Sequence, residues 1–125
     1  MLGFGIETDF DSAALTERCS AVFGSAVGML GDAVMADCEI YVPFDTGALC
    51  RSVRRGRVTE GDGAIGCDVI WSAPHAAAVY YGDARGVRYR TEHHAHARAR
   101  WFEGARGSAG ARWNDVVRGC VREQF

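Results

Sequence analysis

A cluster of histidines in the last third of the chain is the first feature whose side chains suggest chemistry. Glu92, His93, His94 and His96 offer one carboxylate and three imidazoles, and His75 lies upstream. Carboxylate oxygens and imidazole nitrogens are ordinary zinc ligands. Zinc sites, however, use separated, pre-oriented pairs such as CxxC or HExxH, and neither spacing occurs here. We therefore expect a solvated polar segment, with no metal and no cofactor.

A second candidate is the acidic turn Phe44-Asp45-Thr46-Gly47-Ala48. Asp-Thr-Gly-Ala after apolar residues is the loop of aspartic proteases, whose small homodimeric members share one proton between two carboxylates. Pro43 opposes this hypothesis because it interrupts the preceding strand, and so does the helical first third of the chain, because that fold is nearly all β. Ile65-Gly66 also matches the usual second element poorly. The alternative is that Asp45 caps a turn whose Gly47 has an unusual backbone angle. We expect no catalytic residues.

The third candidate is the arginine-rich stretch of residues 85–106. It holds six arginines, three histidines, Tyr89 and Trp101, against Glu92 and Glu103. Arginines with aromatic neighbours bind phosphates and stack on bases, so a nucleic-acid-binding module remains an alternative. No recognised nucleic-acid motif surrounds the stretch, and the net charge of the chain is −2. We therefore expect no specific nucleic acid, and docking on an acidic protein surface explains the stretch equally well.

The charges are distributed unevenly along the chain. Residues 1–50 carry eight acidic residues and only Arg18, a net charge of −7, whereas residues 51–125 carry thirteen arginines and eight acidic residues, a net charge of +5. Opposite charges on two parts of one subunit favour head-to-tail contacts between copies, which close into a ring. We expect this separation to serve contacts between subunits, because an isolated chain has no use for it.

Size and composition place the chain among globular proteins. It has 125 residues, of which 48% are hydrophobic and 24% charged, so we expect a single domain over residues 1–125. The five cysteines include no CxxC pair and no leader precedes them, so we expect free thiols in a reducing compartment. The apolar window of residues 21–36 is short for a membrane span and contains Asp32, so we expect no membrane association.

The pattern of apolar residues predicts an α+β fold. A helical stripe predicts a long helix over about residues 12–39, and alternating residues predict a β-hairpin over about 52–72. Pro74 opens a short helical turn that Gly82 should stop, and residues 83–100 form a polar, mobile loop. The glycines at 104, 107 and 110 weaken the helical pattern after Trp101, so the C-terminal helix is expected over about 111–123.

The segment Glu39-Ile40-Tyr41-Val42-Pro43-Phe44-Asp45-Thr46-Gly47-Ala48-Leu49-Cys50-Arg51-Ser52-Val53 resembles tailed-bacteriophage minor capsid and head–tail joining (tail-completion) proteins. In that family an apolar-Val-Pro run precedes an Asp-Thr-Gly turn, a Leu and a Ser that opens a strand. The later segments Ile70–Ala76, Val79-Tyr80-Tyr81-Gly82 and Trp101–Arg106 resemble the rest of the family in the same order. His75, Cys50 and the His/Arg-rich loop depart from the family pattern.

The resemblance implies a structural virion protein rather than an enzyme. It implies an α+β domain in which a long N-terminal helix packs on a small antiparallel sheet, with a C-terminal helix. Copies would assemble as a ring or another homo-oligomer near the portal vertex, in contact with portal, connector and tail proteins. The protein would be found in the virion, and in the bacterial host cytoplasm during assembly.

The resemblance also assigns roles to residues. Pro43, Asp45, Thr46 and Gly47 would set the angle between helix and sheet, and Leu49 and Trp71 would pack under the helix. The structural residues of the motif are Pro43, Asp45, Thr46, Gly47, Leu49, Ser52, Tyr81, Gly82 and Trp101. The expected partner interface consists of Tyr80, Tyr81, Arg85, Arg88, Arg90 and Trp101.

Overall fold

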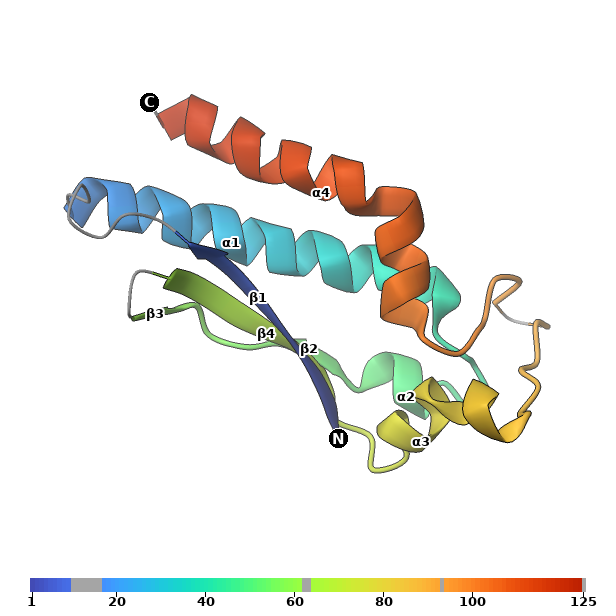
Figure 1. Cartoon of the computed structure of the whole chain (residues 1–125). Coiled ribbons are helices and arrows are strands. Elements are labelled where there is room, and N and C mark those ends of the chain that lie inside the picture. The colour runs from blue at the N-terminus through green and yellow to red at the C-terminus, as the bar shows by residue number, and fades with distance from the viewer. Residues whose placement is uncertain (10–16, 62–63, 93, 125) are drawn as a thin grey trace.

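Two long helices are layered on one face of a small antiparallel sheet (Figure 1). The computed structural model describes residues 1–9, 17–61, 64–92 and 94–124. The elements, in chain order, are β1 (Leu2–Asp9), α1 (Glu17–Cys38), the 3-10 helix η2 (Glu39–Tyr41), α2 (Ala48–Arg51), β2 (Val53–Arg55), β3 (Thr59–Gly61), β4 (Ala64–Trp71), α3 (Ala76–Tyr80), the 3-10 helix η3 (Gly82–Arg85) and α4 (Trp101–Gln124). This arrangement confirms the predicted α+β class.

Strand β4 is the centre of the sheet. β1 pairs with its whole length on one side, from Leu2 opposite Trp71 to Asp9 opposite Ala64. β2 and β3 pair with its two ends on the other side, and all pairs are antiparallel. Strand β1 was not predicted. Its apolar residues Leu2, Phe4 and Ile6 do alternate as a strand requires, but Gly3 and Gly5 between them lower the strand propensity.

The predicted hairpin over 52–72 is present with a broken first strand. Ser52 ends α2 instead of opening a strand, and its hydroxyl donates to the carbonyl oxygen of Leu49 at 2.7 Å. Between β2 and β3 the chain leaves the ladder at residues 56–58. Val58 turns toward Val27 and Ile65 in a small apolar cluster, so burying this side chain interrupts the strand.

Helix α1 covers the inner face of the sheet. Its buried residues recur at helical spacing and include Val22, Ala26, Val27, Val34 and Cys38. The helix was predicted over 12–39, and residues 12–16 of that range lie outside the described residues. By length and composition residues 21–41 also meet the criterion for a membrane-crossing helix, with a mean hydropathy of 1.3. Core helices pass the same test, and one face of α1 lies in the core.

Helix α4 begins ten residues earlier than the predicted boundary at 111, at Trp101. The glycines misled the prediction because propensity is a weak term, and here packing outweighs it. Trp101, Ala105, Ala109 and Trp113 are all buried and share one face of the helix. Gly104 has a packing reason, since a Cβ there would lie 2.9 Å from the Arg98 side chain. The helix bends along its length, and most of it lies beside α1 (Figure 1).

An aromatic cluster joins the sheet to the C-terminal half. The ring of Trp101 lies 5.6 Å from Trp71 and 4.7 Å from Tyr80, both edge to face. Phe4 of β1 stacks on Phe102 at 4.5 Å and lies 5.3 Å from Tyr80. Such pairs stabilise by about 0.5–1.5 kcal/mol each beyond the area that they bury. The cluster therefore fixes β1, β4, α3 and α4 together.

A polar contact sets how α4 sits on α1. The Trp113 Nε1–H donates to Oδ2 of Asp37 at 2.7 Å, and Arg112 forms an ion pair with the other carboxylate oxygen. The Asp37 side chain is only 21% exposed. A hydrogen bond to a partly buried carboxylate is worth more than a surface ion pair. The hydrogen bond between Trp113 and Asp37 therefore fixes the register of the two helices.

We expect Asp37→Ala to lower the free energy of unfolding by about 1–3 kcal/mol, because it leaves the indole N–H of Trp113 without its acceptor. Trp113→Phe should show a coupling energy with Asp37→Ala in a double-mutant cycle measured by urea unfolding. Asp32→Ala is the matched control, because Asp32 pairs with Arg55 at 2.7 Å but is 59% exposed. The control should cost less than about 1 kcal/mol. Equal losses for the two aspartates would contradict the role given to Asp37.

Candidate partner-binding surface

The turn after η2 holds the motif residues in a fixed geometry. Val42 has the extended backbone (φ −74°, ψ 128°) that a following Pro43 favours. Gly47 has φ +85°, which confirms the prediction of an angle unfavourable for other residues. The backbone N–H of Ala48 donates to Oγ1 of Thr46 at 3.3 Å, and Arg51 N–H donates to the Gly47 carbonyl at 3.0 Å. The turn thus ends by starting α2.

The remaining motif residues lie on both sides of this turn. Leu49 is 6% exposed and belongs to the same core cluster as Trp71 and Cys38, so α2 contributes to the main core through this side chain. Gly82 is buried, and a Cβ there would lie within van der Waals overlap of the Tyr89 hydroxyl. Helix α3 ends at Tyr80 with Tyr81 as its C-cap, so the helical turn ends before Gly82, as predicted. Gly82 then begins the 3-10 helix η3, and the absence of a side chain there leaves room for Tyr89.

The polar loop begins at Gly86, and hydrogen bonds hold it to the rest of the protein. The Tyr89 hydroxyl donates to the Val79 carbonyl at 2.6 Å, and His94 Nδ1 bonds to the Val42 carbonyl at 2.7 Å. The backbone N–H groups of Arg98 and Arg100 donate to the carbonyls of Tyr41 and Tyr80. The prediction of a mobile loop did not include these hydrogen bonds. They join residues far apart in the sequence, and no local pattern reports them.

These contacts bring two segments together around one cavity of about 340 Å³: the turn of residues 43–47, which we call the motif turn, and residues 86–100, which we call the arginine loop. The cavity is lined by Pro43, Phe44, Asp45 and Leu49 from the turn side, by His75 and Val79, and by Val87, Arg88, Tyr89 and Arg90 from the loop. Arg90 Nη1 lies 3.9 Å from Oδ1 of Asp45, with both side chains mostly exposed. Two sets of residues that the sequence suggested separately therefore form one surface.

The expectation that Tyr80 and Trp101 belong to the partner interface is wrong. Tyr80 is 1% exposed and Trp101 is 0% exposed, because both belong to the aromatic cluster. Tyr81 is 46% exposed, and the guanidinium of Arg100 lies 5.2 Å from its ring centre. Sequence reasoning missed Val87, which is 48% exposed on the same loop. The sequence did offer a sign of this residue, because Val87 is apolar and lies within a run of polar residues.

The arginines of the loop differ in how free they are. Arg85, Arg88 and Arg90 are all exposed. Arg85 Nη2 donates to the Ala78 carbonyl at 3.0 Å, and Arg100 pairs with Asp83 and Glu103. Among the residues that the structure describes, Arg88 has no ion-pair partner. We call the exposed residues of this segment, Tyr81, Arg85, Val87, Arg88 and Arg90, the Arg–Tyr surface.

Ion pairs within the fold neutralise part of the opposite charges that are separated along the sequence. Asp32 pairs with Arg55, Asp37 with Arg112 and Asp45 with Arg90, each an acid from the first fifty residues with a later arginine. The expectation that an isolated chain has no use for this separation is therefore wrong. The pairs join α1 to the sheet, α1 to α4, and the motif turn to the loop.

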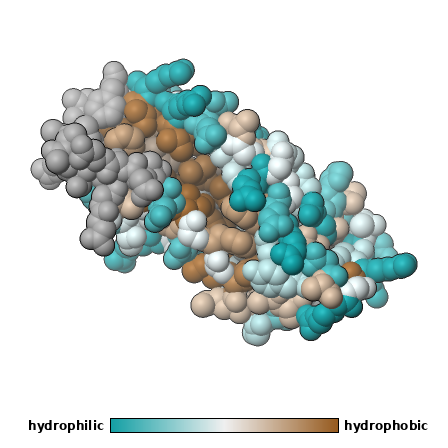
Figure 2. Space-filling view, in the orientation of Figure 1, coloured by the Kyte–Doolittle hydropathy of each residue, from teal (hydrophilic) through white to brown (hydrophobic). Residues whose placement is uncertain are grey.

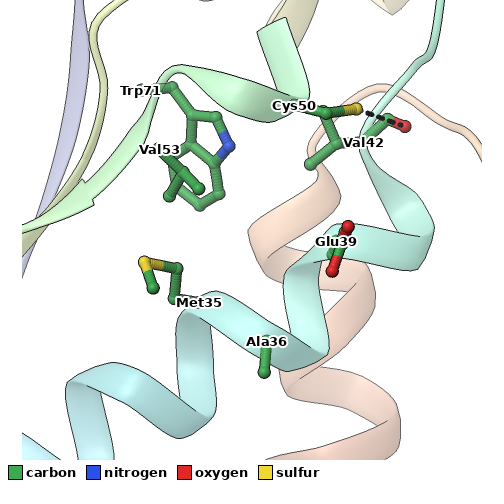
Figure 3. Close-up of a pocket in the computed structure, with 7 residues that line it drawn as sticks. All are labelled: Met35, Ala36, Glu39, Val42, Cys50, Val53 and Trp71. Carbon is green, nitrogen blue, oxygen red and sulfur yellow. Dashed lines mark hydrogen bonds between the residues drawn. The ribbon is translucent and has the colours of Figure 1, made fainter. Parts of the chain in front are cut away.

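A second cavity, of about 240 Å³, opens between α1 and the sheet (Figure 3). Met35, Val53 and Trp71 provide apolar walls, while Glu39 and Cys50 are its polar members. The Cys50 Sγ–H points to the Val42 carbonyl at 4.0 Å. Burial raises the pKa of the Cys50 thiol above its ordinary 9.0, and the nearby Glu39 raises it further. The thiol is therefore protonated at neutral pH, so this cavity is suited to an apolar group rather than to nucleophilic chemistry.

The geometry also bears on the three chemical hypotheses. Asp45 has 86% of its side chain exposed and precedes a helix, whereas a shared-proton dyad requires a shielded pair of carboxylates. Within the described ranges, no three His, Cys, Asp or Glu side chains are grouped closely enough to hold a metal ion. Trp101 is buried, the Tyr89 hydroxyl is engaged and Phe102 stacks on Phe4, so none of the three aromatic rings of the 85–106 stretch is presented as a stacking platform.

The chain is similar to a known protein family. The family model described as minor capsid protein matches residues 20–120, which is most of the chain. No curated protein and no solved structure matches the chain.

Gly47→Ala should destabilise the protein by about 2–3 kcal/mol, since φ is +85° and a Cβ would also lie 2.9 Å from the Phe44 ring. Gly86→Ala is the matched control, because φ is +73° there but a Cβ would meet nothing within 4 Å. The control isolates the backbone cost, about 1–2 kcal/mol. Urea unfolding of both variants checks the difference. A Gly47→Ala variant as stable as the control would show that the turn has room for a side chain.

Four of the five cysteines, Cys38, Cys50, Cys67 and Cys120, are free, as expected, and the side chain of Cys19 lies outside the described part of the structure. Because the raised pKa lowers the thiolate fraction, native Cys50 should react with iodoacetamide at pH 8 more slowly than free cysteine, and faster as the pH rises above 9. Burial raises the pKa of Cys38 to about 12, so Cys38 should react only after unfolding. Peptide mass spectrometry, with a urea-unfolded sample as the control, measures both. Rapid labelling of Cys50 at pH 7 would indicate an activated thiolate instead.

Proposed function

We propose that this chain, which belongs to the minor capsid protein family and is a structural component of the phage particle, acts in joining the head to the tail near the portal vertex. Its partners there would be further copies of itself and the portal, connector and tail proteins. It would be made in the host cytoplasm and be incorporated into the virion during assembly. The family match supports the structural role, and the finer position is our proposal.

The observation that carries this proposal is the Arg–Tyr surface. Arg85, Arg88 and Arg90 are exposed, Val87 lines the same cavity as Arg88 and Arg90, and Tyr81 is exposed directly after α3. Apolar side chains next to arginines are typical of protein interfaces, where the apolar groups supply affinity and the charges set orientation and association rate. The surface suits an acidic neighbour with an apolar centre.

The position of this surface also supports a joining role. It is built on the segment from α3 to the start of α4, whose two ends are fixed by Tyr80 and Trp101 in the core. The hydrogen bonds of Tyr89 and His94 hold the loop between them. A preorganised loop loses little conformational entropy on binding. Such a surface fits a permanent structural contact better than a transient one.

Charge reversal tests the proposal. The triple variant Arg85→Glu, Arg88→Glu, Arg90→Glu should reduce the yield of infectious tailed particles at least about tenfold when it replaces the wild-type protein, because three like charges would face the acidic neighbour. Its melting temperature should stay nearly unchanged, since exposed ion pairs contribute about 0–1 kcal/mol.

The matched control reverses three other exposed arginines, Arg57, Arg118 and Arg122, and so changes the net charge equally on other surfaces. The control should assemble normally. If the first triple variant also gives tailed particles at the wild-type rate, the Arg–Tyr surface has no part in joining. If both variants fail alike, net charge rather than this surface is responsible.

A further inference from the structure

The two edges of the sheet differ in whether another strand can be added. On the side of β2 and β3 the edge is interrupted, because β2 has three residues and the chain leaves the ladder at residues 56–58. The Arg54 guanidinium also donates to the carbonyls of Val53 at 2.7 Å and Arg51 at 2.9 Å. Short strands, bulges and covering side chains are the usual means of blocking an edge. This edge is closed.

The opposite edge, formed by β1, is continuous. Its eight residues pair one to one with β4 without a bulge, and it contains no proline and no lysine. The other side of β1 faces no described strand, since the order of the sheet is β1-β4-β2. In Figure 1 this strand crosses the front of the fold with its outer side uncovered by any labelled element.

The direction of the free backbone groups follows from a contact on the far side of β4. The Gly56 N–H donates to the Asp68 carbonyl at 2.7 Å, so the backbone polar groups of Asp68 point toward β2. Asp68 is opposite Gly5 of β1. In an antiparallel pair, a residue opposite such a position has its N–H and C=O directed away from the shared strand. By alternation, the N–H and C=O groups of Gly3, Gly5 and Glu7 lie on the free edge.

Apolar side chains border this edge on the inner face. Leu2, Phe4 and Ile6 pack against the core but are only partly buried. Figure 2 shows apolar residues gathered in a diagonal band on this face of the molecule, with hydrophilic residues along one of its sides. A strand added to β1 would place its own apolar residues beside these three. Edge and band together form a site for an extended segment with alternating apolar residues.

We propose that the strand added to this edge is β1 of a second copy, antiparallel and related by a two-fold axis at Gly5. The proposal is independent of the head–tail role. Gly5 would exchange both hydrogen bonds with Gly5 of the other copy, and Gly3 would do so with Glu7. Phe4 would lie beside Ile6 of the other copy on the inner face. The two four-stranded sheets would become one continuous sheet.

Three observations favour pairing of β1 with β1 of a second copy. The alternatives are pairing with a different strand of that copy and a head-to-tail arrangement of copies. Strand β1 itself has the required alternation, with apolar residues inward and Gly3 and Gly5 outward. The two-fold register places the charge of Glu7 opposite a glycine rather than opposite another carboxylate. The closed edge at β2 excludes head-to-tail sheet extension, so edge pairing between copies must be isologous.

A single substitution at the centre of the edge tests the proposal. Gly5→Pro removes the N–H that faces the second copy, and the bonds of β1 to β4 remain because they belong to the residues on either side. It should raise the dimer dissociation constant at least about tenfold, since each copy loses one hydrogen bond of the pair. Gly5→Ala keeps the N–H and is the matched control. Sedimentation equilibrium over a concentration series measures both, and circular dichroism verifies folding.

Cross-linking tests the register without depending on the proline variant. Gly5→Cys should form a disulfide-linked dimer under mild oxidation, because directly opposed residues have Cα atoms within the range that a disulfide spans. Mass spectrometry should identify the bond between the two position-5 side chains, with wild type oxidised in parallel to account for the natural cysteines. A wild type that stays monomeric, a dimer that survives Gly5→Pro, or a dimer without the position-5 cross-link would each overturn the proposal. So would pairing of the edge with a strand of a different virion protein.

Discussion

The aromatic contact of Trp101 with Trp71 and Tyr80 is the constraint on which most of the structure depends. It brings the end of β4, the end of α3 and the start of α4 to one point. No described residue accepts a hydrogen bond from the buried Trp101 Nε1, so packing alone positions this ring. Because Tyr80 and Trp101 flank residues 81–100, the cluster also fixes both ends of the arginine loop. Burial thus excludes these two rings from the Arg–Tyr surface and fixes the chain on either side of it.

Electrostatics refines an arrangement that apolar packing has already set. Asp37 accepts from Trp113 and pairs with Arg112, and it is the least exposed acid among the ion pairs. The pairs Asp32–Arg55 and Asp45–Arg90 are more exposed and contribute little individually. Opposite charges separated in the sequence thus stabilise contacts between elements that apolar packing has already brought together. What remains for partners is a local excess of arginine beside Tyr81 and Val87.

The sequence was informative where burial has a simple period. The stripe of α1 and the alternating residues of β4 predicted a helix and the second strand of a hairpin, and the Asp45-Thr46-Gly47 turn predicted the angle of Gly47. Prediction failed where a distant contact decides the local structure. Glycines lower the local propensity of β1 and of the first turns of α4, so the sequence pattern did not predict these segments. Both are stabilised by stacking between rings that lie far apart in the sequence, Phe4 and Phe102. For the same reason Tyr80 and Trp101 were misplaced on the surface: an aromatic residue beside a polar loop carries no local sign of burial.

The two proposed contact surfaces differ in chemistry and so would do different work. Backbone pairing along β1 depends little on side-chain identity, and its selectivity comes from the alternation of apolar residues and glycine. The Arg–Tyr surface depends on charge, which discriminates between neighbours and governs how fast they associate. An edge pair of this length is weak alone, as are three exposed arginines. A particle that displays many copies converts weak contacts into a durable assembly, because each contact holds the others at high effective concentration. On these two proposals, a small subunit with two modest surfaces is sufficient for a structural role.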